Sequence, residues 1–218
     1  MKGCRKNMQN RILTSAILLS VFIVPIMIMS GCINTKHAPL EIHYYTLEYD
    51  PPPFVKANQL PYTVKIEQFQ TSPLYDSNRI IFKKEDYTRD EYAYHKWRAH
   101  PGELVSFFLT RDFSETGRFQ ATLYYESNLP YTHLITGVVE DFYLQAGDSG
   151  KAVLSITVNL VDSTRRNNSN AILMQKKYRL GIETKTGGPQ GLANAMSTAM
   201  QQISEDILMD VADRLEKY

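Results

Sequence analysis

The chain has 218 residues, enough for one ordinary domain with a substantial hydrophobic core, and its formal net charge at neutral pH is +1. Four of its 24 basic residues and none of its 23 acidic residues lie before residue 32, so the remainder carries 20 basic against 23 acidic residues, a net charge of −3. This balance lacks the basic excess of nucleic-acid-binding proteins and excludes nucleic acid as an expected partner.

The chain begins with the three parts of a bacterial export signal. A basic stretch, residues 1–11, precedes a nearly unbroken apolar run, residues 12–29, and small residues then lead to Gly31 and Cys32. The run has about the length of a short membrane span, but Pro25 within it weakens a permanent helix. Small residues before a cysteine match a lipobox, in which a lipid alkylates the thiol and a peptidase cuts before it. We therefore expect cleavage between Gly31 and Cys32 and lipidation of Cys32, rather than a retained transmembrane anchor.

The cysteine content agrees with a lipid anchor. Of the two cysteines, Cys4 lies in the signal, so Cys32 is the only thiol left after processing and has no partner for an internal disulfide. Residues 1–31 are thus predicted to be the signal peptide, residues 32–41 a lipidated tether and residues 42–218 a single domain. Nine tether residues span at most roughly 30 Å when fully extended, so the domain must stay close to its membrane.

Alternating and aromatic-rich segments after the tether predict eight strands. We place them at residues 42–49, 62–69, 79–83, 91–97, 120–125, 132–145, 151–162 and 171–183. Within the last two, one face collects apolar residues: Leu154, Ile156, Val158 and Leu160 in the first, and Ile172, Met174, Tyr178, Leu180 and Ile182 in the second. A period of two with one apolar face is typical of antiparallel strands with one buried side.

Two segments have helical periodicity. Pro101 suits the first turn of a helix that ends before Gly117, with Leu104, Val105, Phe108 and Leu109 on its apolar face. After Pro189, a second apolar stripe continues over roughly 40 Å and contains Leu192, Met196, Ala199, Met200, Ile203, Ile207, Val211 and Leu215. The predicted fold is α+β: a largely antiparallel or mixed sheet of about eight strands covered by two main helices, the second long and C-terminal.

One short segment resembles catalytic motifs but lacks the residues that these motifs require. The residues around Ser149, from Gly147 to Gly150, are similar to the nucleophile segment of trypsin-like serine proteases, but no histidine has the setting of the matching base. The same segment cannot be a phosphate loop, because Ala152 replaces the required Ser or Thr and a strand follows. A polar hairpin turn explains these residues, and we predict a protein that is not an enzyme.

Metal and cofactor sites are not expected either. The five histidines lack metal-ligand spacing: His37, His43, His95, His100 and His133. The acidic residues between Glu85 and Glu91 alternate with basic ones, which is typical of a solvated loop rather than of a tuned carboxylate pair.

Tyrosine-rich segments leave two interpretations open. One segment contains Tyr87, Tyr92, Tyr94 and Trp97, and the other contains Tyr124, Tyr125 and Tyr131. Tyrosine favours strands, so packing within the sheet explains most of them. Tyrosine and tryptophan also anchor protein interfaces, and the sequence does not separate the two roles.

The order of these landmarks resembles the ABC-type transport auxiliary lipoprotein family, which includes the paraquat-inducible C-type lipoproteins. The matching pieces after the lipobox are Tyr44–Leu47, Val64–Ile66, Arg79–Phe82, Tyr94 and Trp97 before the Pro101 helix, Gly117–Phe119, Gly137–Phe142 and the closing amphipathic helix. The chain departs from the family pattern in a long charged insert, Lys83–Asp90.

The resemblance implies a non-enzymatic accessory of a Gram-negative lipid transport system. Such a system contains an ABC transporter and a mammalian-cell-entry family protein that crosses the periplasm, and the auxiliary lipoprotein docks this bridge, plausibly as a homo-oligomer. Ile33 stands where enteric lipoproteins retained in the inner membrane have Asp, so we expect an outer-membrane anchor facing the periplasm. The alternatives are a structural outer-membrane lipoprotein unrelated to transport and a lipid-tethered periplasmic hydrolase.

Overall fold

The structure is a computed structural model, and it describes residues 40–52, 58–147, 150–165 and 171–218. The chain divides into two units, Met1–Leu40 and Glu41–Tyr218, and every element described below lies in the second. The expected signal peptide, Gly31 and Cys32 lie outside the described residues, as does most of the tether. Cleavage and lipidation therefore stay predictions.

The second unit contains nine strands, one short 3-10 helix and two α-helices among its described residues. In chain order they are β1 (His43–Tyr45), β2 (Leu60–Ile66), β3 (Gln70–Thr71), β4 (Arg79–Lys83), β5 (Asp90–Trp97), α2 (Pro101–Glu115), β6 (Phe119–Leu123), β7 (His133–Gln145), β8 (Lys151–Asp162), η1 (Ser163–Arg165), β9 (Ile172–Glu183) and α3 (Gly188–Glu216). The strands form one mixed sheet.

The long strand β7 organises this sheet. One edge of β7 pairs antiparallel with β8, which pairs antiparallel with β9. The other edge pairs in parallel with three successive strands: β2 at residues 133–135, β3 at residues 138–139 and β4 at residues 144–145. β6 extends the sheet from β2, whereas β5 and then β1 extend it from β4. β6 and β1 therefore belong to opposite ends of β7.

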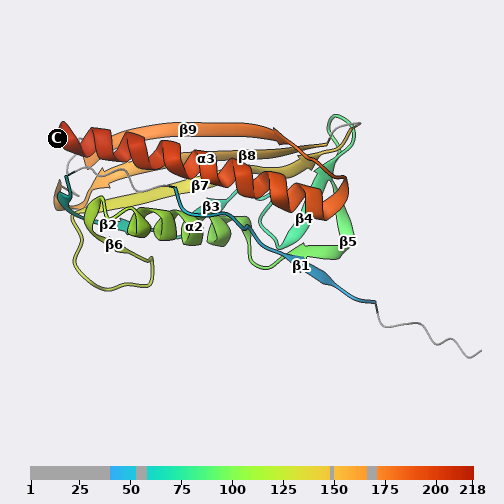
Figure 1. Cartoon of the computed structure of the whole chain (residues 1–218), viewed down its shortest axis with the longest axis horizontal. Coiled ribbons are helices and arrows are strands. Elements are labelled where there is room, and N and C mark those ends of the chain that lie inside the picture. Colours follow the sequence, from blue (N-terminus) through green and yellow to red (C-terminus); the bar gives the residue numbers. More distant parts are fainter. Residues whose placement is uncertain (1–39, 53–57, 148–149, 166–170) are drawn as a thin grey trace, which may run out of the picture. The chain divides into compact units, whose positions relative to one another are not determined.

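Both helices cover the same face of the sheet (Figure 1). The predicted apolar face of β8 is fully buried there, from Leu154 to Leu160 at every second residue. All eight residues of the predicted α3 stripe are at most 2% exposed. α3 has 29 residues, about 44 Å at 1.5 Å per residue, so it covers nearly the full length of the long strands.

The predicted α+β fold, with a mixed sheet and a long C-terminal helix, is confirmed. The strands that the alternation missed or misplaced have local causes. β3 has two residues, too few for a period to appear. Ile172 is wrong as a member of the buried face: it is exposed and Leu173 is buried instead, because the pairing register shifts between Leu160 and Val161. A bulge of this kind moves the following side chains to the other face of the strand.

The sheet face opposite the helices carries charged side chains from β7 and β9 and uncharged polar ones from β8. Glu140 accepts hydrogen bonds from Thr157 and Lys177, and Asp141 pairs with Arg179. The hydrogen bonds from Lys177 and Thr157, aided by the charge of Lys177, hold the pKa of Glu140 below its usual range. Cross-strand pairs of opposite charge such as these stabilise the sheet modestly and leave this face polar.

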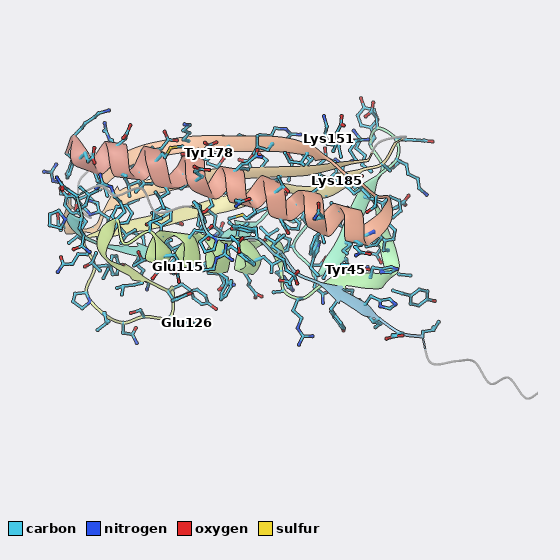
Figure 2. All side chains as sticks on the ribbon, viewed as in Figure 1. Tyr45, Glu115, Glu126, Lys151, Tyr178 and Lys185 are labelled. Carbon is cyan, nitrogen blue, oxygen red and sulfur yellow. The ribbon has the colours of Figure 1, made fainter. Side chains whose placement is uncertain are left out.

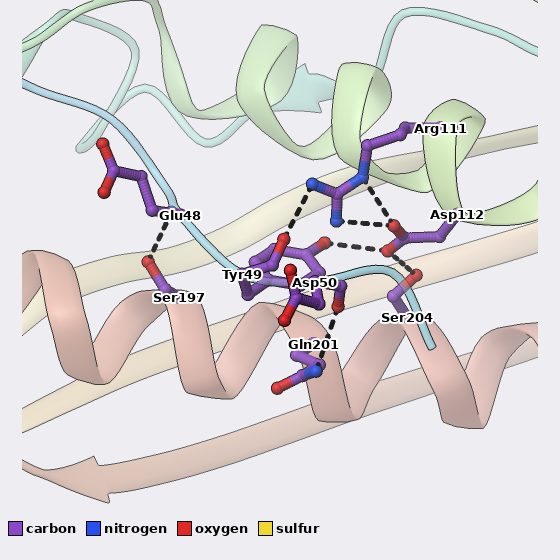
Figure 3. A network of polar contacts seen from close by, with 8 residues as sticks. All are labelled: Glu48, Tyr49, Asp50, Arg111, Asp112, Ser197, Gln201 and Ser204. Carbon is purple, nitrogen blue, oxygen red and sulfur yellow. Dashed lines mark hydrogen bonds and ion pairs between the residues drawn. The ribbon is translucent and has the colours of Figure 1, made fainter. Parts of the chain in front are cut away.

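A buried polar clamp fixes the chain between β1 and residue 50 to both helices (Figure 3). The Asp112 carboxylate on α2 is fully buried and accepts hydrogen bonds from the Tyr49 hydroxyl at 2.8 Å and the Ser204 hydroxyl at 2.6 Å. Arg111 donates to the same carboxylate at 2.7 Å and to the Tyr49 carbonyl at 2.9 Å. Burial and the nearby Asp112 charge raise the pKa of the Tyr49 phenol far above its usual range. The segment that follows the tether is thus tied to the body of the domain.

Candidate docking groove

A groove of about 500 Å³ lies between the outer side of α2 and the chain that follows β6. Its walls combine apolar and acidic side chains: Ala99, Glu103, Leu104, Phe107, Tyr124, Tyr125 and Glu126. The Phe107 and Tyr124 rings lie 6.3 Å apart between centroids across the groove. Glu126 is in the loop below α2 in Figure 2. We refer to these seven residues as the α2 groove.

Phe107 is the residue that makes this groove unusual. It is 53% exposed, although the helix around it has an exposed arc that otherwise carries polar residues such as Glu103 and Ser114. Its position is set by the helix, because residues five apart lie about 140° apart around the axis, which places Phe107 nearly opposite the buried Asp112. A single exposed apolar residue is common, but Phe107 shares the groove with a second exposed aromatic ring, that of Tyr124, and such a group marks a candidate binding surface.

The facing wall is held in place by contacts to β2. The Lys65 ammonium donates to the Ser127 carbonyl at 3.2 Å and lies 5.5 Å from the centre of the Tyr131 ring. The Ser127 amide donates to the Tyr124 carbonyl at 3.0 Å and closes a turn. These contacts orient Tyr124, which is 41% exposed, toward α2.

The rim of the groove is acidic. The Tyr125 hydroxyl donates a hydrogen bond to Glu126, and this bond, together with the charges of Glu126 and Glu103, raises the pKa of Tyr125. Among the described residues, none that lines the groove is basic. The α2 groove can therefore receive an apolar side chain flanked by a positive charge.

The structure separates the tyrosines that the sequence left undecided. Trp97 is buried and packs edge-on against Phe142, so it belongs to the core. Tyr92 is half-buried against Phe82. Tyr87, Tyr94 and Tyr124 are exposed, and Tyr124 alone of these lines the groove.

The histidines are mostly apart, with one pair that the sequence did not indicate. His43 and His95 stack at 5.3 Å between ring centroids because β1 and β5 place them in register. His100 lies 3.3 Å from Asp76, and His133 is buried. Within the described ranges no three His, Cys, Asp or Glu side chains gather as metal ligands would. Ser149 and His37 lie outside those ranges.

Comparison with known proteins identifies the family. The model of the ABC-type transport auxiliary lipoprotein component matches residues 45–208, most of the chain. The chain belongs to this auxiliary lipoprotein family. The family is one of membrane-anchored accessory proteins rather than of known enzymes, and the resemblance stated from the sequence is confirmed.

Solved structures show that the fold is shared. The crystal structure of protein XCC0632 from Xanthomonas campestris has a TM-score of 0.69 at 13% identity and covers 81% of this chain and 97% of its own. A second crystal structure, of an uncharacterized protein, has a TM-score of 0.62 at 13% identity, covering 78% of this chain and 99% of its own. A search of curated proteins found no match to this chain. At these identities the likeness extends to the fold alone.

The landmarks that carried the resemblance are mainly packing residues. Leu47, Val64 and Ile66 are buried, and Gly137 has no room for a side chain: a Cβ there would lie 2.2 Å from the Thr157 carbonyl oxygen and 2.4 Å from the Phe69 ring. The charged insert Lys83–Asp90 is an exposed loop beyond Lys83, as its mixed charges predicted.

Among the described helices, none has the length and apolar character needed to cross a membrane.

Proposed function

We propose that this auxiliary lipoprotein is a non-enzymatic docking component of an ABC-type lipid transport system, held in the outer membrane by a lipid on Cys32 and facing the periplasm. Membership of the auxiliary family supports a place beside an ABC transporter. The export signal and the lipobox ending at Cys32 support the anchor, and Ile33 after the cysteine supports the outer membrane. The proposed partner is a mammalian-cell-entry family protein, as the family resemblance implies.

The observation that most supports a docking role is the pair of exposed aromatic rings in the α2 groove. Phe107 is held on α2, and Tyr124 lies just after β6 in a turn closed by the Ser127 amide and held by Lys65, so the exposure of both rings is set by the fold. Aromatic residues in a partly enclosed groove are typical anchors of protein interfaces, where truncating one costs about 1 kcal/mol or more. The acidic rim formed by Glu103 and Glu126 favours a partner segment with an apolar side chain beside Lys or Arg.

Self-association is the second part of the proposal, and it rests on the family resemblance. Among the described strands β9 pairs only with β8, so its other edge is open. This edge carries Lys176, Lys177 and Arg179, which disfavour pairing with an edge strand of another copy. Copies of the domain would therefore associate through other surfaces.

The test is purification of the native lipoprotein from its own membranes, followed by identification of the proteins that accompany it. We expect components of an ABC transporter and a mammalian-cell-entry protein. The Phe107→Ala variant should recover at least about fivefold less partner, since a loss of 1 kcal/mol or more corresponds to that factor. Met209→Ala is the matched control, because Met209 is equally exposed on α3.

Recovery of the lipoprotein without any transport component would contradict the proposal and favour a structural lipoprotein. Equal recovery with Phe107→Ala and Met209→Ala would instead contradict the groove as the docking site. Thermal unfolding of each variant, measured alongside, separates lost docking from lost folding.

A further inference from the structure

Exposed apolar side chains gather with the half-buried Lys96 and the exposed Arg98 where the chain enters the domain, on β1 and β5. Tyr44 is 51% exposed; β1 pairs it with Lys96 on β5, and the Arg98 guanidinium lies 5.5 Å above its ring. Ile42 just before β1 is 41% exposed, and Tyr94 on β5 is 45% exposed. We refer to Ile42, Tyr44, Tyr94, Lys96 and Arg98 as the β1–β5 patch.

The opposite side of the same two strands does the packing. His43 stacks on His95, the Tyr45 hydroxyl and His95 Nδ1 form a hydrogen bond of 3.0 Å, and Trp97 is buried in the core. Tyr45 is labelled in Figure 2 on the strand that leads in from the tether. His43, Tyr45 and Trp97 thus make the packing contacts of β1 and β5. The exposed apolar side chains of the patch lie on the other side of these strands and have no packing role there.

The patch carries uncompensated positive charge. Within the described chain neither Lys96 nor Arg98 forms an ion pair, whereas Arg79, next to Lys96 on β4, is paired with Glu91 at 2.5 Å. The Arg98 amide donates to the Tyr45 carbonyl at 2.7 Å, which fixes the backbone beneath its guanidinium. Two cations therefore project beside two tyrosines and an isoleucine from a hydrogen-bonded strand pair.

The sequence places this patch next to the proposed anchor. β1 begins at His43, eleven residues after Cys32, and a fully extended chain covers at most about 3.6 Å per residue, or about 40 Å in all. Tyrosine rings favour the boundary between lipid headgroups and hydrocarbon, and clustered Lys and Arg are attracted to anionic lipids.

We propose that the β1–β5 patch lies against the headgroups of the membrane that carries the anchor, with Ile42, Tyr44 and Tyr94 at the interface and Lys96 and Arg98 against lipid phosphates. The inference rests on the proposed lipid anchor at Cys32. The groove begins at Ala99, directly after Arg98, but its Tyr124 wall follows β6, which extends the sheet from the opposite end of β7. Contact through the patch therefore orients the domain with the Tyr124 wall of the groove open to a partner.

The test uses the full lipidated chain in vesicles of phosphatidylethanolamine and phosphatidylglycerol. After processing, Cys32 is the only cysteine and its sulfur is blocked by lipid, so Tyr94→Cys introduces the sole free thiol. A fluorophore on that thiol reports contact through quenching by lipids with a nitroxide headgroup. Tyr124→Cys is the matched control, because Tyr124 is exposed to a similar extent but lies in the groove.

We expect several-fold stronger quenching at Tyr94→Cys than at Tyr124→Cys, and a decrease when Lys96→Glu and Arg98→Glu are added to the Tyr94→Cys chain. Equal quenching at both positions, in chains that float with the vesicles, would overturn the membrane contact while the anchor stands. A chain that does not float would overturn the anchor and the contact together. Strong cross-linking of position 94 to a protein in native envelopes, without quenching, would assign the patch to a partner instead.

Discussion

At the scale of single residues, we expect Asp112 to contribute most to the stability of the folded domain. It is fully buried, and its carboxylate accepts from Tyr49, Arg111 and Ser204. The Asp112→Ala variant leaves a partly buried guanidinium and two hydroxyls without their acceptor, and removing one member of such a pair costs about 3–5 kcal/mol. We expect this loss in the free energy of unfolding from urea titration.

The matched control is Asp213→Ala on the same long helix as Ser204. Asp213 is 72% exposed and 4.0 Å from Lys217, so its removal should change the free energy of unfolding by about 0.5 kcal/mol or less. Similar losses for the two variants would show that the clamp does not hold the helices together.

A second residue links stability to pH. His133 is buried, and its Nε2 has no hydrogen-bond partner among the described residues. Burial lowers the pKa of His133, although the charge of the nearby Asp162 acts in the opposite direction. The unfolded chain has the ordinary histidine pKa of about 6.5 and so binds a proton that the folded chain does not. Stability is therefore fully present above that value and is lost as the pH falls from about 6.5 toward the lowered folded pKa.

The measurement is the melting temperature between pH 7.5 and 5 for the natural chain and for His133→Gln. The natural chain should lose stability more steeply below about pH 6.5, since only it has the buried imidazole to protonate on unfolding. Parallel curves for the two proteins would contradict this assignment.

At the scale of elements, periodicity located most strands and both helices but did not always give their ends. β4, β8 and the ends of α2 match the predicted ranges, and the α3 stripe is buried throughout, whereas the strands predicted at residues 42–49 and 62–69 end earlier, at Tyr45 and Ile66. Periodicity does not predict which strands pair. β7 pairs in parallel with β2, β3 and β4, which lie more than forty residues earlier in the chain. No local pattern encodes such a pairing.

The groove was predictable in part. Phe107 falls off the apolar stripe of α2, and that signal is readable from the sequence. Its meeting with Tyr124 is not, because it depends on β6 pairing with β2 and on Lys65 holding the following turn. The sequence left the tyrosine-rich segments open between sheet packing and an interface, and the structure shows that Trp97 is buried in the core whereas Tyr124 lines the groove.

The acidic rim of the groove makes a prediction at this scale. Glu126→Lys should slow association of the partner at low salt, because a rim charge acts mainly on the rate of encounter. The difference from the natural chain should shrink as salt screens the charges. Glu115→Lys, an exposed glutamate on α2 outside the groove, is the control for net charge.

Binding rates measured by surface plasmon resonance at two salt concentrations distinguish the cases. A slower rate for Glu126→Lys alone supports a basic partner segment in the groove. Equal slowing by both variants would mean that overall charge, and not the groove, attracts the partner.

At the scale of the whole molecule, three features lie along one path. The proposed lipid at Cys32 leads through a short tether to β1, the clamp at Asp112 ties the next segment to both helices, and α2 presents Phe107 on its far side. A partner bound in the groove would thus be connected to the membrane through ordered contacts from residue 43 to α2. This continuity supports the proposed docking role.

The most direct test of that account is a photo-cross-linking amino acid at position 107 in living cells. We predict an adduct with a mammalian-cell-entry protein of an ABC transporter, absent when the same amino acid replaces Met209 and lost when Cys32→Ser removes the anchor. An adduct of equal yield from positions 107 and 209, or none from position 107 with the lipoprotein present at normal levels, would contradict docking through the α2 groove.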